Sequence, residues 1–320
     1  MKKMGVITTG GDAPGMNAAI RAVTRIASSK NLQVLGFMSG WEGLITNTFN
    51  PLTPRSVGGI IQLGGTILHT SRCPAFEKKV GIKKAAETLA LNTVDGLIVI
   101  GGDGSMRGAL ELSRETDALI VGVPATIDND VTGTDETIGF DTAVNTAVGE
   151  IDKIRDTAIS HERIFIVEVM GRERGFLALT IGLTVGAEII LIPEKKYERQ
   201  EIFKTIKENI AKGKKSGIIV AAEGVVDTRE LAREIEKNTD TEVRLSILGY
   251  AQRGGSPTAR SRLLANLFAN EAVRLLTEKQ GRRMVGLQNG KITSIALEET
   301  CTSRKPLDTN LLRLAKVLAT

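Results

Sequence analysis

Residues 98–105, IVIGGDGS, decide the fold of this chain. A short β-branched run followed at once by glycines is typical of a buried strand that turns into the start of a helix. The same pattern opens the chain, where residues 4–8, MGVIT, lead into GGDAPGMN at residues 10–17. Two such turns predict a parallel α/β sheet, in which ligands bind at the carboxyl ends of the strands.

Apolar runs and helical patterns alternate along the rest of the chain, which predicts an α/β fold with mostly parallel sheets. We expect strands at residues 4–8, 33–37, 96–100, 118–123, 164–169, 188–192, 217–222 and 243–248. We expect helices at residues 17–28, 83–91, 105–112, 141–159, 199–212, 228–236 and 260–276. The length of 320 residues predicts two domains.

Composition excludes several classes of protein. The 42 Lys and Arg are spread among 37 Asp and Glu, and only 8 Phe, 2 Tyr and 1 Trp could stack on bases, so we expect no nucleic-acid partner. Two Cys and two His exclude a disulfide framework and a Cys- or His-rich metal site. No apolar run approaches the ~20 residues of a membrane span, so we expect a cytoplasmic protein with no membrane partner.

The two glycine turns are candidate phosphate sites. Gly10 and Gly15 have the glycine spacing of a P-loop, but Met16-Asn17 stands where Lys-Ser/Thr is required. A tight turn alone would also explain these two glycines. In the second turn, Asp103 places a carboxylate among bare backbone, which suits Mg²⁺ that keeps most of its waters. The alternative is that Asp103 caps the following helix.

A further loop, ATIDND at residues 125–130, follows the strand expected at residues 118–123. Asp128 and Asp130 point the same way if the chain there is extended, so that one could act as a base while the other assists a metal. The alternative is a plain turn rich in Asp and Asn.

Arginines after strand ends or beside glycines suit bidentate contacts with phosphate. Four such arginines are Arg72, Arg172, Arg174 and Arg253. Each alone could be an ordinary surface charge. Together with the carboxylates, they favour phosphoryl transfer between two anionic substrates.

Taken together, these motifs resemble those of the bacterial ATP-dependent 6-phosphofructokinases over essentially the whole chain. The matching stretches are residues 10–19 (GGDAPGMNAA), 101–105 (GGDGS), 126–130 (TIDND), 169–172 (VMGR) and 252–257 (QRGGSP). The resemblance implies transfer of the ATP γ-phosphoryl to the 1-hydroxyl of fructose 6-phosphate, with Mg²⁺ as cofactor. It implies two Rossmann-like domains: residues 1–138 plus 251–301 for nucleotide, and 139–250 plus 302–320 for sugar phosphate.

The resemblance also implies roles for individual residues. Asp128 would be the general base, beside Thr126, while Arg72 and Arg172 would offset phosphoryl charge and Asp103 would serve Mg²⁺. The nucleotide site would comprise Gly11, Arg72, Cys73, Gly102, Asp103, Gly104 and Ser105. The sugar-phosphate site would comprise Thr126, Ile127, Asp128, Arg163, Met170, Gly171, Arg172, Glu223, Arg244, Tyr250 and Arg253.

Two of these residues, Arg163 and Arg244, would reach the 6-phosphate from a neighbouring subunit, which implies a homotetramer. An effector site between subunits would bind ADP as activator and phosphoenolpyruvate as inhibitor. Its residues would be Arg21, Arg25, Arg155, Glu188, Lys212 and Lys214.

Several positions depart from the family pattern. Tyr250 and Ser216 replace histidines, Ala125 a glycine, Trp41 a tyrosine, Ser261 an aspartate and Pro54 an arginine. A diphosphate-dependent phosphofructokinase is the nearest alternative. Residues 64–72 and 171–175 look closer to that branch, whereas the small Gly104 and uncharged Ala125 favour ATP. A non-catalytic sensor of metabolites is a further alternative, although Asp103 and Asp128 are both present. Lipid and NAD kinases share GGDG but lack the TIDND and QRGGSP context.

Overall fold

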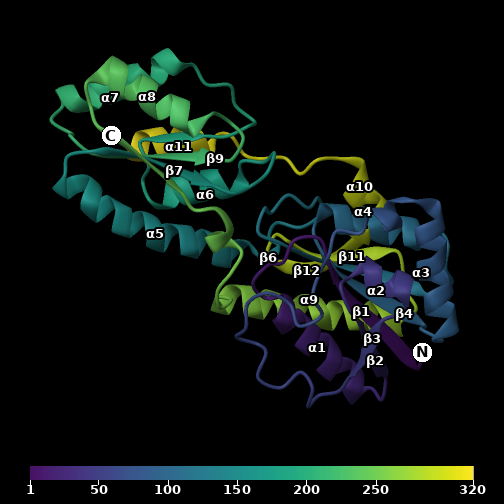
Figure 1. Ribbon diagram of the computed structural model, residues 1–320. Helices are drawn as coiled ribbons and strands as arrows, with labels where there is room; N and C mark the ends of the chain where they lie inside the picture. Colours follow the sequence, from purple (N-terminus) through teal and green to yellow (C-terminus); the bar gives the residue numbers. More distant parts are fainter. Residues whose placement is uncertain (320) are drawn as a thin grey trace. The chain divides into compact units, whose positions relative to one another are not determined.

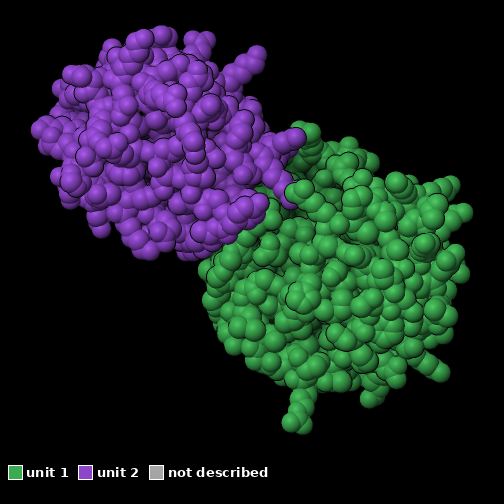
Figure 2. Space-filling model, in the orientation of Figure 1, with its two compact units in different colours: residues 1–142, 253–305 green, residues 143–252, 306–320 purple. Residues whose placement is uncertain are grey.

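The chain folds into two compact α/β units, seen in a computed structural model that describes residues 1–319 (Figures 1 and 2). Unit 1 comprises Met1–Thr142 and Arg253–Lys305, and unit 2 comprises Ala143–Gln252 and Pro306–Thr320. The last residue of the expected second domain, Thr320, lies outside the described residues.

Unit 1 is built on a mostly parallel sheet whose strands follow the order β12-β11-β5-β4-β1-β2-β3, with β6 paired to β5. The strands are β1 (Lys3–Thr9), β2 (Gln33–Phe37), β3 (Phe49–Leu52), β4 (Gly96–Gly101), β5 (Leu119–Thr126), β6 (Ile138–Gly139), β11 (Arg283–Gln288) and β12 (Lys291–Ala296). Among the strands within residues 1–319, only the outer pairs β2–β3 and β11–β12 of this sheet are antiparallel. The chain leaves β1 toward β2 and later returns to β4 on the other side, so the glycine turns after β1 and β4 lie side by side.

Helices cover both faces of this sheet, as the nearly continuous Val and Ile runs of β1, β4 and β5 require. One face is covered by α1 (Met16–Ser29) and α9 (Ala259–Thr277), and the other by α2 (Trp41–Thr46), α3 (Lys79–Leu91), α4 (Asp103–Leu112) and α10 (Leu297–Thr302) (Figure 1). A short 3₁₀ helix, η1 (Pro74–Glu77), precedes α3.

Unit 2 contains a parallel four-stranded sheet in the order β10-β7-β9-β8. Its strands are β7 (Ile164–Val169), β8 (Ile189–Leu191), β9 (Gly217–Ala222) and β10 (Val243–Ile247). Its helices are α6 (Phe176–Thr184), α7 (Arg199–Ala211), α8 (Thr228–Thr239) and α11 (Leu311–Leu318), with the 3₁₀ helix η2 (Gly249–Gln252) after β10. The long helix α5 (Phe140–Ser160) carries the chain from unit 1 into unit 2.

The α/β fold with mostly parallel sheets is therefore confirmed, and a strand lies at each of the eight expected places. Four strands were not expected, namely β3, β6, β11 and β12, and neither were α2, α6, α10 and α11. Helix α6, FLALTIGLT, is apolar on all sides because most of it is buried. It therefore lacks the one-sided spacing by which a surface helix is recognised in sequence.

Candidate active site

The turn after β1 needs glycine for its backbone. Gly10 and Gly15 have φ angles of +86° and +108°, and a Cβ on Gly15 would lie 2.6 Å from Cγ2 of Ile138. The tight turn by itself thus explains these glycines. The amino end of α1, which follows at Met16, also offers backbone N–H groups to an anion.

Asn17 forms hydrogen bonds with the segment that leads to the nucleotide-site candidates Arg72 and Cys73. Its Oδ1 accepts a hydrogen bond from the N–H of Ile67 at 2.7 Å, and its Nδ2 donates to the carbonyls of Leu63 and Gly64. Farther along the same segment, Thr70 Oγ1 donates to the carbonyl of Gly10 at 2.7 Å. These bonds hold residues 63–70 beside the first glycine turn, with Arg72 exposed just beyond them.

Asp103 is the first residue of α4, and the helix cap is Gly102, which makes no side-chain cap. The alternative in which Asp103 caps the helix is therefore wrong. Its Oδ2 instead accepts a hydrogen bond from Nε of Arg107, one helical turn later, at 3.0 Å. This carboxylate raises the pKa of the Arg107 guanidinium. Arg107 was missed in the sequence, although its i, i+4 spacing from Asp103 is a usable signal.

The other residues of the second glycine turn bring β4 against β5. A Cβ on Gly102 would lie 3.3 Å from Cβ of Thr126, so the two strand ends touch here. Ser105 is buried and its Oγ donates to the carbonyl of Thr9 at 3.0 Å, which ties α4 to β1. A Cβ on Gly104 would meet nothing within 4 Å, so space lies beside this turn.

Asp128 is almost completely buried, at 3 % exposure, just past the end of β5. Its N–H donates to Oγ1 of Thr126 at 3.2 Å, and that hydroxyl lies 3.4 Å from the Asp128 carboxylate. Asn129 has a φ of +53°, so the chain turns between Asp128 and Asp130. The chain is therefore not extended here, and the condition under which both carboxylates would point the same way is not met. Ile127, between Thr126 and Asp128, is buried.

Three of the departures from the family pattern, at Ala125, Trp41 and Ser261, are buried in unit 1. Ala125 is fully buried, so its methyl group packs in the core. Trp41 is buried and stacks on Phe76, with ring centroids 4.0 Å apart. Ser261 is also buried, with Oγ 2.8 Å from Oγ1 of Thr142.

The structure places Arg253 in unit 1, against the first glycine turn. A Cβ on Gly11 would lie 3.0 Å from Nη1 of Arg253, and Oδ1 of Asp12 lies 4.0 Å from the same nitrogen. The partly buried guanidinium of Arg253 therefore lies beside the turn that contains Gly11.

Four sugar-phosphate candidates of unit 2 gather at the carboxyl ends of β7 and β9. They are Met170, Gly171, Arg172 and Glu223. Oε1 of Glu223 accepts a hydrogen bond from the N–H of Arg172 at 2.7 Å, and Oε1 of Gln252 accepts one from the N–H of Met170 at 2.8 Å. Gly171 has a φ of +141°, and a Cβ there would lie 2.6 Å from the carbonyl oxygen of Arg174. Only glycine fits this turn. Tyr250, in η2, is 80 % exposed.

The other two candidates of unit 2, Arg163 and Arg244, lie at the opposite edge of the same sheet. Arg163 immediately precedes β7, and Arg244 is the second residue of β10, which runs parallel to β7. The six residues of β7 separate the two edges by about 20 Å. Within one copy of the chain, these arginines therefore cannot share a ligand with Gly171 and Glu223.

Both arginines instead pair with one carboxylate, Glu242. Its Oε2 lies 2.5 Å from Nε of Arg163, and its Oε1 pairs with Nη2 of Arg244. The hydrogen bond from Arg163, with the charges of both guanidiniums, lowers the pKa of Glu242. Sequence reasoning missed Glu242, because its contact with Arg163 depends on the pairing of two strands about 80 residues apart.

The effector-site candidates fall into two groups. In unit 2, the buried carboxylate of Glu188 pairs with Lys214 at 2.8 Å, while Nη2 of Arg155 donates to the carbonyl of Val185. Lys212 is exposed at the carboxyl end of α7. In unit 1, Arg21 and Arg25 lie on α1, and Nη2 of Arg25 donates to the carbonyl of Pro54 at 3.4 Å.

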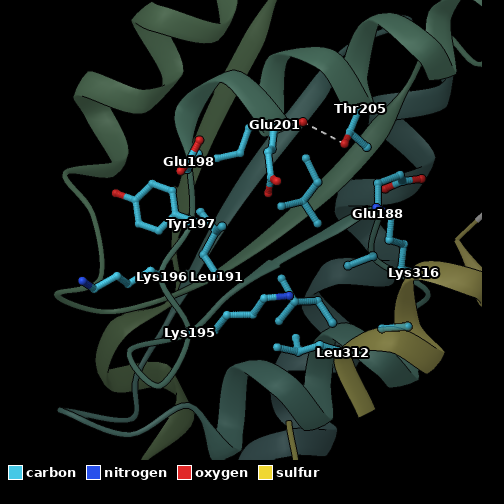
Figure 3. Close-up of a pocket in the computed structure, with 15 residues that line it drawn as sticks. Glu188, Leu191, Lys195, Lys196, Tyr197, Glu198, Glu201, Thr205, Leu312 and Lys316 are labelled. Carbon is cyan, nitrogen blue, oxygen red and sulfur yellow. Dashed lines mark hydrogen bonds between the residues drawn. The ribbon is translucent and has the colours of Figure 1, made fainter. Parts of the chain in front are cut away.

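A cavity of about 150 Å³ adjoins Glu188 and was not expected from the sequence. It is lined by residues of β8, α7 and α11 and by the segment between β8 and α7. Figure 3 shows Lys195 extending into it, Glu201 facing it from α7 and Leu312 bordering it from α11. Because α11 was not predicted, no pattern in the sequence brought these residues together.

Asp103 is the candidate Mg²⁺ ligand singled out in the sequence. Within residues 1–319, no three His, Cys, Asp or Glu side chains cluster so as to hold a metal ion. Mg²⁺ in phosphoryl-transfer sites is commonly held by one or two carboxylates plus the phosphates of the substrate. Asp103, beside the open space at Gly104, fits that requirement.

No helix within residues 1–319 is long and apolar enough to cross a membrane.

The fold and its turns define the class of protein. It is a parallel α/β protein with glycine turns, carboxylates and arginines at the carboxyl ends of its strands, an arrangement suited to phosphate-bearing ligands. A family model described as Phosphofructokinase matches residues 3–276, and the chain belongs to this family, as the resemblance predicted.

Similar proteins were found among curated sequences and solved structures. The chain is 50 % identical over 319 residues to an ATP-dependent 6-phosphofructokinase of Lysinibacillus sphaericus and 49 % identical to that of Bacillus subtilis, covering 100 % of each protein. The structure of phosphofructokinase from Saccharomyces cerevisiae matches with a TM-score of 0.87 and 33 % identity. That match covers 100 % of this chain and 48 % of the yeast chain, so the chain spans about half the length of this neighbour.

Proposed function

We propose that the chain is a glycolytic, ATP-dependent 6-phosphofructokinase of the cytoplasm. It transfers the γ-phosphoryl of ATP to the 1-hydroxyl of D-fructose 6-phosphate, giving fructose 1,6-bisphosphate and ADP. The observation that carries this proposal is the identity of 50 % over the full length of a relative named for this activity. The relatives' name also favours ATP over diphosphate as donor, in agreement with the open space beside Gly104.

Asp128 acts as the general base in this proposal. It accepts the proton of the 1-hydroxyl, and its buried position and its contact with Thr126 fix the direction in which it presents its oxygens. Arg72 and Arg172 offset the charge that grows on the transferring group, which is the dominant requirement of phosphoryl transfer.

Unit 1 supplies the nucleotide site, and most of the residues that bind sugar phosphate lie in unit 2. Asp103 would hold Mg²⁺, which neutralises charge on the donor phosphates when bound. The backbone of Gly11, Gly102, Gly104 and Ser105, together with Arg72 and Cys73, forms the rest of the nucleotide site. Ile127, Met170, Gly171, Glu223, Tyr250 and Arg253 complete the contacts with fructose 6-phosphate.

The position of Arg163 and Arg244, about 20 Å from Gly171 along β7, supports a site shared between copies. A second copy supplies the two arginines, and the assembly is a homotetramer. The group of Arg155, Glu188, Lys212 and Lys214, with Arg21 and Arg25 of a neighbouring copy, binds ADP as activator and phosphoenolpyruvate as inhibitor.

The test is formation of fructose 1,6-bisphosphate from fructose 6-phosphate and Mg²⁺, with ATP and diphosphate offered in separate reactions. We expect product with ATP alone. Product with diphosphate alone would mean that the space beside Gly104 was misread, and the enzyme would belong to the diphosphate-dependent branch. Binding of nucleotide without turnover on either donor would favour a metabolite sensor.

A further inference from the structure

One carboxylate holds two guanidiniums at the amino edge of the unit 2 sheet. Glu242 uses each of its oxygens for a different arginine, Oε2 for Nε of Arg163 and Oε1 for Nη2 of Arg244. The side chains are partly open, with exposures of 27 % for Arg163, 52 % for Arg244 and 40 % for Glu242. Solvent and a ligand can therefore reach all three.

The backbone fixes the place of this carboxylate. Strand β10 pairs with β7 in the register Val243 with Ile164, and the N–H of Ile164 donates to the carbonyl of Glu242 at 3.1 Å. The N–H of Val243 donates to Oε1 of Glu236 at 3.0 Å. Glu242 thus stands next to Arg163 across the two strands and two residues before Arg244 along its own strand.

The pairing leaves one edge of each guanidinium for another anion. Arg163 donates to Glu242 through Nε, and its two Nη groups donate no hydrogen bond to any residue within 1–319. Arg244 donates through Nη2 and keeps its remaining N–H groups. A carboxylate that binds one edge of a planar guanidinium restricts its rotation and directs the other edge outward.

We propose that Glu242 is a positioning residue of the sugar-phosphate site, which orients Arg163 and Arg244 together toward the 6-phosphate of a substrate bound by a neighbouring copy. This role rests on the proposed function, because it requires those arginines to bind that phosphate. Glu242 itself does not touch the substrate. It lowers the conformational cost of bringing two long side chains to one phosphate group.

The test is steady-state kinetics of Glu242→Gln. The amide keeps one acceptor oxygen and loses the other, so one arginine loses its partner. We expect KM for fructose 6-phosphate to rise by about threefold to tenfold, because a charge-assisted contact is weakened and not removed. We expect kcat and KM for ATP to stay unchanged, and the unfolding temperature to match that of the wild type.

A matched control lies in the same unit. Glu230 pairs with Arg199 at 3.1 Å on the surface, in an ion pair of similar exposure that has no place in the proposed site. Glu230→Gln should leave all three kinetic parameters unchanged. The second control is Glu242→Gln in a chain that also carries Arg163→Ala and Arg244→Ala. There the substitution should change nothing further, because Glu242 acts only through those arginines.

An unchanged KM for fructose 6-phosphate in Glu242→Gln would overturn the proposal, because the carboxylate would then not help the arginines. A lower KM would also overturn it, because the carboxylate would then compete with the phosphate. An equal rise of KM with and without the two arginines would also overturn it. If Arg163→Ala and Arg244→Ala do not raise KM for fructose 6-phosphate, the assignment of both arginines fails, and the role of Glu242 with it. Fructose 1,6-bisphosphate formation from ATP by the wild type would still stand in that case.

Discussion

Asp128 owes its position to the turn that carries it. Its own N–H bonds to Thr126, and the left-handed Asn129 that follows is fastened by the N–H of Thr137 at 3.1 Å and by Nζ of Lys305 at 2.9 Å. A substitution at Asp128 therefore removes the carboxylate and its contact with the Thr126 hydroxyl, while the N–H bond to Thr126 and the two bonds to Asn129 do not depend on that side chain.

We expect Asp128→Ser to lower kcat by about 10²- to 10⁴-fold, the usual contribution of a general base. The KM values for ATP and fructose 6-phosphate should stay within about twofold, because the proton is transferred only during the chemical step. Steady-state kinetics with both substrates varied measures this. Asp117→Ser, at an exposed loop before β5, is the control and should retain full turnover. Undiminished turnover in Asp128→Ser would contradict its role as the base.

Single residues show where the sequence was informative. The glycine turns and the carboxylates after strand ends could be recognised because the residues of each motif lie within a few positions of one another in the sequence. An extended chain from Asp128 to Asp130 is not found because Asn129 is left-handed, and the sequence alone does not reveal that φ angle. Glu242 could not be found from sequence, since its pairing with Arg163 needs the order of strands in the folded sheet.

At the scale of elements, the hairpin of β11 and β12 has a local signal in the sequence that the apolar runs do not show. Asn289 and Gly290 connect the two strands, and both have positive φ, +51° and +76°. Asn-Gly between two alternating strands is a strong hairpin signal in a sequence. The hairpin does not stand out as a pair of continuous apolar runs, because β12 is exposed or only half-buried along its length.

We expect Gly290→Ala to lower the free energy of unfolding by about 1 kcal/mol, because an L-residue is strained at this φ. A Cβ there would meet no atom within 4 Å, so the cost would come from the backbone alone. Gly149→Ala is the matched control: it also meets nothing within 4 Å, but it lies in the helix α5. Alanine there should raise stability by up to about 1 kcal/mol. Urea unfolding of both variants tests this, and a loss of stability in both would refute the argument from φ.

A second prediction concerns the amino end of β1. Oδ2 of Asp95 accepts hydrogen bonds from the N–H groups of Lys2 and Lys3, at 2.5 and 2.9 Å. These bonds, that of Lys2 above all, lower the pKa of Asp95 in the folded chain. Since the folded pKa lies below the unfolded value of about 3.9, the contribution to stability is present above pH 4 and is lost as pH falls through the folded pKa.

Asp95→Asn should therefore destabilise the chain at pH 7 by less than about 1 kcal/mol, because Asp95 is exposed and solvent screens it. The difference from the wild type should shrink as the pH is lowered from 5 to 3. Urea unfolding midpoints of both proteins across this range measure it. A difference that stays constant with pH would show that the charge of Asp95 contributes nothing.

At the scale of the whole molecule, the two edges of the unit 2 sheet decide what one chain can do by itself. Arg163 and Arg244 lie at the amino edge, whereas Gly171 and Glu223 lie at the carboxyl edge. The α/β class followed from the alternation of strands and helices. Because β10, β7 and β9 are parallel, their amino ends lie at one edge of the sheet and their carboxyl ends at the other. This strand direction separates the two groups of residues.

A site that draws its arginines from a second copy can be tested by mixing two defective chains. One chain carries Asp128→Ser, and the other carries Arg163→Ala with Arg244→Ala. When they are dissociated, mixed and reassembled, a hybrid pair has one complete site, because the chain with intact Asp128 receives arginines from the chain with intact Arg163 and Arg244.

Random pairing of equal amounts makes about half of the pairs hybrid, each with one of two sites complete, so about a quarter of the wild-type turnover should return. Formation of fructose 1,6-bisphosphate before and after reassembly measures this. Each defective chain, reassembled alone, is the control and should stay at its own low rate. If the mixture gains no activity although hybrids form, the arginines act within their own chain, and the separation of about 20 Å along β7 would have to be bridged by a rearrangement of unit 2.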